Sequence, residues 1–357
     1  MEREDITRTI IELTIDKVFV DVEIDAERRI RNLVDLGQNF SKGQFQRSFF
    51  EMVQKMLAND ESPYYLHAKN TIAQVNHETL KTFGINLGYN GCTKGVRQIR
   101  ENRATYHFNI PWSITFSLTD THRISQYDIE RVILEGEQLG VYVYLIFCTT
   151  ERIKEVVYLL EKFPDCAFIL FLKGTFIKSQ AMGALHKYHN FMISTLFESK
   201  DCSQTTDYLT QNGFLHAVHS FYNDAHLEEI ISGAWIKNAL RTSSTFAFLI
   251  HETSCSHEVK KEVEKYVIGV REQQRYPIFL MEFTMDMNSI DRIISEESHS
   301  IGFNSEGQVY TAMGKLEGGK NNLLAGNLQE ILEHNMPIHA SGESTSLFES
   351  DSPVIIE

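Results

Sequence analysis

The feature that most constrains the fold of this chain is a regular alternation of two kinds of segment, which begins near residue 110. Short apolar runs rich in β-branched and aromatic residues alternate with segments whose apolar residues recur at helical spacing. The strand-like runs cover residues 112–118, 141–148, 167–172, 191–197, 214–222, 245–251 and 278–283, and the helical segments cover residues 127–139, 152–162, 180–188, 204–212, 227–240 and 258–274. Strands that are almost continuously apolar predict a parallel sheet covered by helices. Six or seven such units predict an α/β fold with a partial or curved barrel.

The segments on either side of this pattern have a different character. Residues 1–105 are mostly helical in pattern, with helices expected over residues 25–36, 44–57, 64–75, 80–87 and 96–103. Asn76 and Thr93 are each expected to cap the helix that follows. Beyond residue 283 we expect a hairpin of residues 300–304 and 308–313, a helix over residues 328–334, and a disordered acidic tail over residues 341–357.

Composition and charge exclude several classes of partner. The formal net charge of -14 argues against a role in binding nucleic acid or an anionic membrane, because both require basic surfaces. The charged start MEREDITR is unlike a secretion signal, and no segment has the apolar length that spans a bilayer. We therefore expect a cytoplasmic protein.

The five cysteines give no sign of a disulfide framework or a metal site. Their number is odd and they are widely scattered, at Cys92, Cys148, Cys166, Cys202 and Cys255. Possible zinc ligands gather between residues 251 and 257, but their spacing matches no established zinc pattern. We expect buried, reduced thiols, no bound metal, and a serine in this segment that caps the following helix.

The loop after the first strand is the place where α/β folds of this kind usually carry chemistry. Here it is short and holds Asp120 and His122, with no cysteine and no glycine. A histidine beside a carboxylate could transfer protons, so these two residues are the candidate catalytic pair. A solvated turn in which Asp120 bonds to the backbone is the simpler interpretation and the one we favour.

Several segments along the chain resemble the radical S-adenosylmethionine (SAM) family, in the type with a helical N-terminal extension and a SPASM-like C-terminal region. The resemblance rests on NIPWSITFSLTD at the first strand, GEQLGVYVYLIF at the second, EKFPDCAFILFLKGTFI at the third, YPIFLMEF near the seventh, and IGFNSEGQVYTAMGKLEGGKNNLLAGNLQEIL near the end. It implies a partial (β/α)6 TIM-like barrel with an all-helical N-terminal extension and a small C-terminal α+β region. The implied units are residues 1–108, 109–284, 285–340 and the tail 341–357.

The sequence departs from that family where its cofactors bind. In the family, a CxxxCxxC loop after the first strand holds a [4Fe–4S] cluster through thiolates. This chain has only THRISQYD between Asp120 and Ile129, so the cluster loop is absent, and cysteines for a C-terminal cluster are absent as well. The glycine-rich GGEP segment that contacts SAM is also missing at the second strand. We therefore predict no [4Fe–4S] cluster and no other cofactor, and SAM binding is disfavoured.

A vestigial pocket is the remaining expectation for the ends of the second and third strands. It would involve Thr149, Thr150 and Glu151 in place of the glycine-rich segment, and Lys173 and Gly174 in a reduced form of the family's NGT. Our leading hypothesis is a pseudoenzyme that acts as a binding, regulatory or accessory subunit for a protein, peptide or small ligand, including a cluster-bearing homologue. The alternative is an enzyme or a SAM-binding or small-molecule-binding protein that uses a repurposed pocket at these strand ends.

Overall fold

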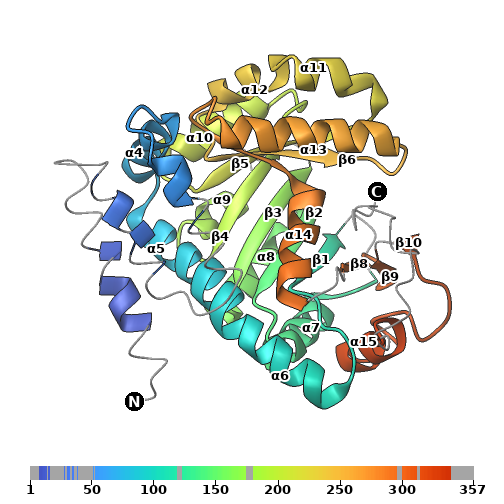
Figure 1. The fold of residues 1–357 in the computed structure, drawn as a ribbon. Coiled ribbons are helices and arrows are strands. Elements are labelled where there is room, and N and C mark those ends of the chain that lie inside the picture. Colours follow the sequence, from blue (N-terminus) through green and yellow to red (C-terminus); the bar gives the residue numbers. More distant parts are fainter. Residues whose placement is uncertain are drawn as a thin grey trace.

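The computed structural model describes residues 8–13, 15–16, 28, 30–32, 34–35, 38, 51, 53–118, 123–173, 180–295, 300–311 and 314–338. In this part of the chain the strands form one ten-stranded sheet in the order β10-β9-β8-β1-β2-β3-β4-β5-β6-β7 (Figure 1). The strands are β1 (Ser113–Leu118), β2 (Val143–Thr149), β3 (Ala167–Lys173), β4 (Phe191–Leu196), β5 (His216–Tyr222), β6 (Phe246–His251), β7 (Phe279–Glu282), β8 (Ile301–Asn304), β9 (Val309–Thr311) and β10 (Gly314–Lys315). From β8 to β7 all neighbours are parallel, whereas β9 and β10 are added antiparallel.

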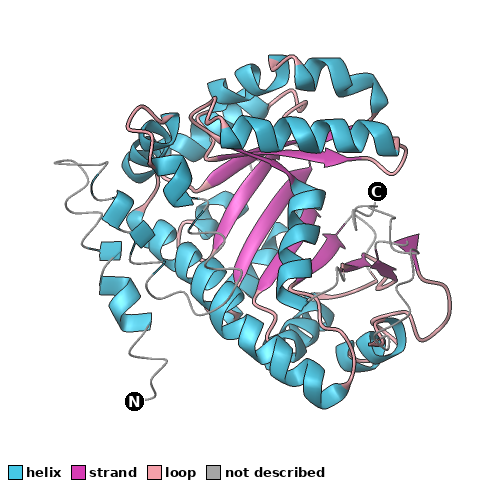
Figure 2. Ribbon diagram, viewed as in Figure 1, coloured by secondary structure: helices cyan, strands magenta, loops and turns pink. Residues whose placement is uncertain are grey.

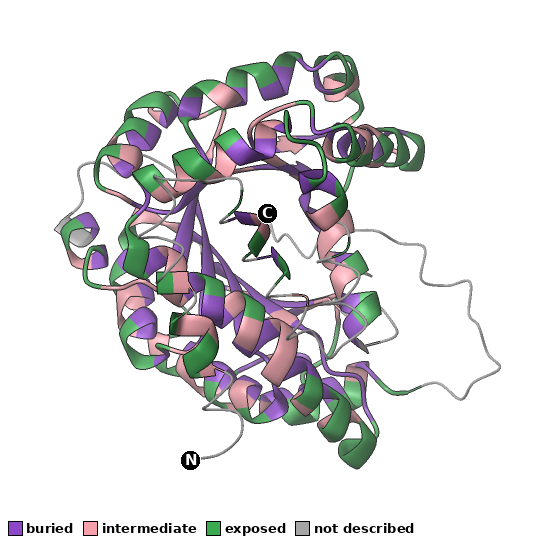
Figure 3. Ribbon diagram, turned by 60° about the vertical axis from the view of Figure 1, so that its left-hand side comes forward, coloured by how far each residue is buried: buried purple, intermediate pink, exposed green. Residues whose placement is uncertain are grey.

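The sheet curls into a partial barrel with helices outside it, as Figures 2 and 3 show. The helices after the first strand are α7 (Gln126–Leu139), α8 (Ile153–Lys162), α9 (Gln180–Leu185), α10 (Cys202–Gln211), α11 (Leu227–Ile231), α12 (Ala234–Ala239), α13 (His257–Glu272), α14 (Phe283–Ser295) and α15 (Leu328–Asn335). The residues described before β1 contain no strand; they include α4 (Pro63–Gln74), α5 (His77–Ile85) and α6 (Val96–Tyr106), and Phe108 forms an isolated β-bridge with Pro337. The predicted fold class, an α/β partial barrel, is confirmed.

Alternate strand residues build the core on the outer face of the sheet. The rings of Phe303, Phe116, Tyr144 and Phe168 form a continuous stack across β8, β1, β2 and β3, with neighbouring centroids 5.7–6.4 Å apart. All four are fully buried under the surrounding helices. Burying one such side chain contributes roughly 1.5–3 kcal/mol, so this row is a large part of the packing that holds the helices to the sheet.

The end of the barrel at which the strands begin is closed by a continuous helical segment. A π-helix over Asn86–Gly95 joins α5 to α6. Asn86 Nδ2 donates to the carbonyls of Pro164 (2.7 Å) and Cys166 (2.9 Å), just before β3. The prediction that Thr93 caps a new helix is wrong, because its hydroxyl bonds to Gly88 O inside this segment.

The other predicted caps and boundaries can be compared directly with the structure. Asn76 caps α5 by accepting from the amides of Glu78 and Thr79, as predicted. Ser256 caps α13 by accepting from the amide of Val259, so a serine of the segment 251–257 caps the following helix, as predicted. The single helix expected over residues 227–240 is wrong: it is broken into α11 and α12 at Gly233, whose φ is +76°.

The C-terminal hairpin forms as predicted, but its first strand has an additional role. β8 pairs in parallel with β1, so the hairpin extends the barrel sheet. Helix α14 connects β7 to β8 across the open side of the barrel (Figure 1). The predicted tail over residues 341–357 lies outside the described residues.

Candidate functional site

The inner face of the barrel is lined with aromatic side chains. Phe147 on β2 and Phe171 on β3 are register partners, and their rings stack with centroids 4.3 Å apart and an interplanar angle of 9°. Phe248 from β6 and Phe283 from α14 pack against Phe171, at 6.0 Å and 5.1 Å between centroids. All four side chains are buried. The middle of the half-barrel is therefore filled by phenyl rings.

Polar side chains occupy the next layer toward the carboxyl ends of the strands. Thr149 follows Phe147 by two residues and Lys173 follows Phe171 by two, so both point into the barrel, and the two are register partners. His219 on β5 lies on the same face and contacts the Phe171 ring edge-on, with centroids 5.2 Å apart. His216, three residues earlier, faces the helices instead and lies near Thr210 and Ser244. A separation of three residues along a strand thus places these two histidines on opposite faces of the sheet.

The environment of His219 keeps its ring neutral. Its Nδ1 lies 2.9 Å from the hydroxyl of Ser194 on β4, and both side chains are buried. Burial among the rings, together with the positive charge of Lys173, lowers the pKa of His219 to about 3. At neutral pH the positive charge in this layer therefore belongs to Lys173.

Two of these polar groups lack partners. The buried hydroxyl of Thr149 has no hydrogen-bond partner, and within the described residues Lys173 has no ion pair. Thr150 and Glu151 lie in the 3-10 turn after β2, where Thr150 is half-buried and Glu151 is exposed. Of the predicted pocket residues, the structure thus brings Thr149 and Lys173 together inside the barrel.

The predicted catalytic pair cannot be placed. Asp120 and His122 lie outside the described residues, as does Gly174. The described end of that loop is fixed to its surroundings, because the amides of Arg123 and Ile124 both donate to Ser305 O, at 3.1 and 3.0 Å. Ser305 belongs to the turn between β8 and β9, so the C-terminal hairpin holds the connection from β1 to α7.

A fully buried arginine supports the same connection. Arg152 Nη2 donates to Ile124 O (3.0 Å) and forms an ion pair with Glu155 (2.6 Å). Its Nε and Nη1 are buried without a hydrogen-bond partner. Arg152 packs beside Cys148, which faces the outer helices, so it stabilises the outer layer of the sheet rather than the barrel interior.

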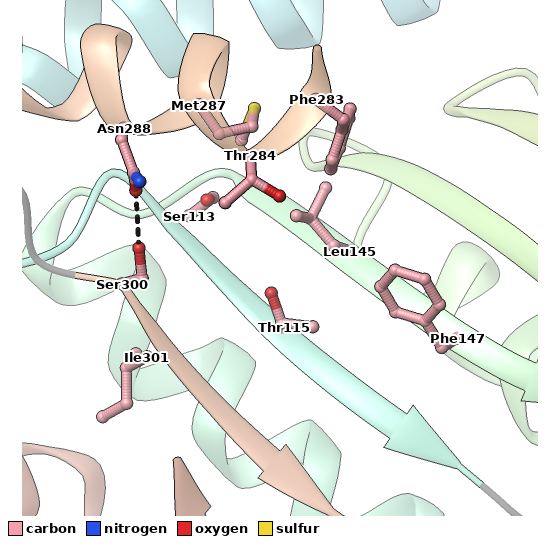
Figure 4. A pocket seen from close by; sticks show the side chains of 10 residues that line it. All are labelled: Ser113, Thr115, Leu145, Phe147, Phe283, Thr284, Met287, Asn288, Ser300 and Ile301. Carbon is pink, nitrogen blue, oxygen red and sulfur yellow. Dashed lines mark hydrogen bonds between the residues drawn. The ribbon is translucent and has the colours of Figure 1, made fainter. Parts of the chain in front are cut away.

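A small cavity lies between α14 and the start of the barrel strands (Figure 4). It has a volume of about 40 Å³ and is bordered by Thr115 of β1, Phe147 of β2 and Asn288 of α14. Ser300 Oγ donates to Asn288 Oδ1 at 3.0 Å on one side of it. At ~10–15 Å³ per water molecule, this space holds a few waters.

Sequence reasoning missed a buried ionisable network on the outer face. Glu282 Oε1 accepts from Tyr222 Oη (3.0 Å) and lies 2.8 Å from His251 Nδ1, while Glu282 Oε2 accepts from the amide of Met285 at the start of α14 (2.7 Å). Burial and the nearby carboxylate raise the pKa of Tyr222 above its ordinary value. Three charged or polar residues at the ends of adjacent apolar strands were the available signal, and they link β5, β6 and β7 to α14.

The five cysteines lie on five different parts of the fold. They occupy the π-helix (Cys92), β2 (Cys148), the turn before β3 (Cys166), α10 (Cys202) and the loop after β6 (Cys255). Burial raises the pKa of Cys148 to about 12 and also raises the pKa of the other four thiols. In the part of the chain that the structure describes, no three His, Cys, Asp or Glu side chains are grouped to hold a metal ion. Among the same residues, no helix combines the length and apolar character needed to cross a membrane.

Comparison with known proteins gives only distant likenesses, and these are to solved structures. No protein-family profile and no curated protein matches the chain. The crystal structure of Streptococcus suis SuiB bound to S-adenosylmethionine superposes with a TM-score of 0.49 at 13% identity, over 66% of this chain and 67% of that one.

Proposed function

We propose that this chain is a radical-SAM-like barrel protein without an iron–sulfur cluster, and that it acts as a binding or accessory subunit for a protein, peptide or small ligand. The observation that carries the proposal is the phenylalanine cluster of Phe147, Phe171, Phe248 and Phe283, which fills the barrel interior. Barrel enzymes hold their substrate in a pocket at the carboxyl ends of the strands, above a packed interior. Here the phenyl rings fill the interior to one side-chain layer below those ends, which limits a ligand pocket to the rim.

The distribution of the cysteines does not fit a [4Fe–4S] cluster. Such a cluster needs several thiolates converging on one point. The five thiols of this chain are separated by whole elements, and burial keeps them protonated. Cys148, one residue before the end of β2, points toward the outer helices.

The charge at the strand ends also argues against SAM as the ligand. SAM carries a carboxylate as well as a sulfonium and an ammonium group, and the family binds the ammonium at the end of the second strand, where Lys173 here places a positive charge beside Thr149. Like charges at close range in a poorly solvated site repel strongly. This point supports loss of the cofactor rather than a repurposed SAM site.

Iron and sulfide analysis after anaerobic reconstitution tests the proposal. We expect no stoichiometric iron, and a [4Fe–4S] signal in proportion to the protein would overturn it.

The alternative, an enzyme with a repurposed pocket, is supported by the polar layer of Thr149, Lys173 and His219. A thermal-shift screen with SAM, nucleotides and divalent metals separates the two readings, because a ligand that binds the folded state raises its melting temperature. A shift that Lys173→Ala abolishes, accompanied by turnover of the bound compound, would favour the enzyme.

A further inference from the structure

The polar layer at the mouth of the barrel is built from adjacent strands above a closed floor. Thr149 and Lys173 are register partners on β2 and β3, and each follows a ring of the stacked pair Phe147 and Phe171 by two residues. Successive inward residues on a strand are about 7 Å apart, so the polar layer begins one side-chain layer above the rings. Only the end of a ligand fits into this layer, because the rings of Phe147 and Phe171 fill the space below it.

The described residues of this layer hold two donor groups, one charged and one neutral, that lack a partner among the described residues. Lys173 brings an ammonium group that has no ion pair within the described residues, and Thr149 brings a buried hydroxyl without a hydrogen-bond partner. Glu151, the nearest carboxylate along the chain from Thr149, is exposed and does not pair with Lys173. A buried polar group without a partner costs free energy, which a bound acceptor recovers.

The imidazole ring of His219 borders this layer on one side and is uncharged. Its Nδ1 is occupied by Ser194, and its ring is packed against Phe171 and Phe221. Because burial keeps the ring uncharged, it neither competes with Lys173 for an anion nor attracts a cation. Among the described residues of this layer, the charge is therefore that of Lys173 alone.

We infer that the mouth of the half-barrel binds a terminal oxyanion, a carboxylate or a phosphate, through the ammonium of Lys173 and the hydroxyl of Thr149. A charge-assisted bond from Lys173 orients the anion, and the Thr149 hydroxyl donates a second bond. The rest of the ligand lies outside the barrel, because the phenyl floor leaves no room below. This inference rests on the proposed function, since it specifies what the accessory subunit recognises.

Calorimetric titration of the full chain at constant ionic strength tests it, with three probes. The probes are inorganic phosphate, N-acetyl-alanyl-alanine with a free carboxylate, and the same dipeptide as its amide. We expect the phosphate or the free dipeptide to bind and the amide not to bind. Binding of only one of the two anions identifies the source of the oxyanion.

Variants then assign the binding to this layer. Lys173→Met is expected to weaken binding at least about tenfold and Lys173→Arg to retain it, because an ionic hydrogen bond is lost in the first and kept in the second. Thr149→Val, which removes only the hydroxyl, is expected to weaken binding about threefold. Lys154→Met, at an exposed lysine of α8, serves as the matched control and should bind like the wild type.

Two results would overturn the inference. One is the absence of heat from every anion with the wild-type chain, and the other is equal binding by the wild type and a folded Lys173→Met variant. Should Lys173→Met not fold, unchanged binding by Thr149→Val has the same meaning. Iron analysis of the same preparation shows separately whether the proposed function stands.

Discussion

Phe147 and Phe171 stack face to face inside the half-barrel, with ring centroids 4.3 Å apart, one side-chain layer below the ends of β2 and β3. This pair decides the character of the interior. Helix α14 adds Phe283 from the open side of the barrel, and the rings together leave a polar rim above them and, beside them, a small cavity with room for a few waters. An interior of this kind is suited to holding the fold and presenting a rim, and not to enclosing a substrate.

Truncating the central ring should cost much of the stability. Phe171 is fully buried and contacts three other phenylalanines, so Phe171→Ala should lower the free energy of unfolding by about 3–5 kcal/mol. Urea unfolding monitored by circular dichroism measures this change. Tyr127→Ala is the control, since Tyr127 is 65% exposed on α7 and its loss should change stability by about 0.5 kcal/mol or less. A similar cost for both variants would mean that the rings do not form the core.

The buried Glu282 network should be equally sensitive to loss of its acceptor. Glu282→Ala leaves Tyr222, His251 and the amide of Met285 without their shared partner, and we expect a loss of about 3–5 kcal/mol in the same assay. Glu317→Ala removes an exposed ion pair with Lys315 and should cost less than about 1 kcal/mol. Equal effects of the two substitutions would rule out a buried network at Glu282.

Acid should destabilise the protein through two buried histidines. Burial lowers the pKa of His219 to about 3 and that of His216 to about 4, whereas both take up protons near pH 6.5 when unfolded. The unfolded chain therefore binds more protons below pH 6.5, and stability falls from there toward pH 4. Each histidine contributes a slope of up to about 1.4 kcal/mol per pH unit.

The histidine contribution is separated from that of the carboxylates by a variant. His219→Gln keeps a hydrogen-bonding group near Ser194 but cannot titrate. The dependence of the unfolding free energy on pH between pH 6.5 and 4.5 should therefore become shallower by up to about 1.4 kcal/mol per pH unit, which corresponds to one proton. Denaturant titrations at several pH values provide the measurement. An unchanged slope would show that His219 is protonated in the folded state.

Two helical glycines should respond in opposite ways to alanine. A Cβ on Gly136 of α7 would clash with Tyr144 Oη, and Tyr144 is fully buried, so Gly136→Ala should cost about 1–3 kcal/mol. A Cβ on Gly269 of α13 meets nothing within 4 Å, so Gly269→Ala should gain about 0.5–1 kcal/mol. Melting temperatures of the two variants test the packing of α7 on the sheet. Stabilisation by both would contradict the close contact with Tyr144.

The strands were predictable because each is a short apolar run between amphipathic helices, but the direction of their side chains was not. In a strand that is apolar on both faces, such as β2, nothing in the sequence separates the inward Phe147 from the outward Tyr144. The cluster of phenyl rings inside the barrel is therefore evident only from the structure. His216 and His219 were an exception, because a separation of three residues places them on opposite faces of any strand.

The pairing of strands that are far apart in the sequence could not be predicted either. The four residues of β8 predict a hairpin strand, yet its parallel pairing with β1 depends on α14 crossing the barrel. The Glu282 network depends on the register of β5, β6 and β7, which bring Tyr222, His251 and Glu282 together. Thr149 and Lys173 were predicted as pocket residues, and their proximity follows from the pairing of β2 and β3.

The most direct test of the account is the iron and acid-labile sulfide content of the chain after anaerobic reconstitution with iron and sulfide, measured together with its electron paramagnetic resonance spectrum. Five single variants, in which each cysteine is replaced by alanine, define the background of adventitious iron. We expect the same low iron content for the wild type and all five variants, and no cluster signal. Stoichiometric iron and sulfide with a [4Fe–4S] signal in the wild type, lost in any of the variants, would contradict it.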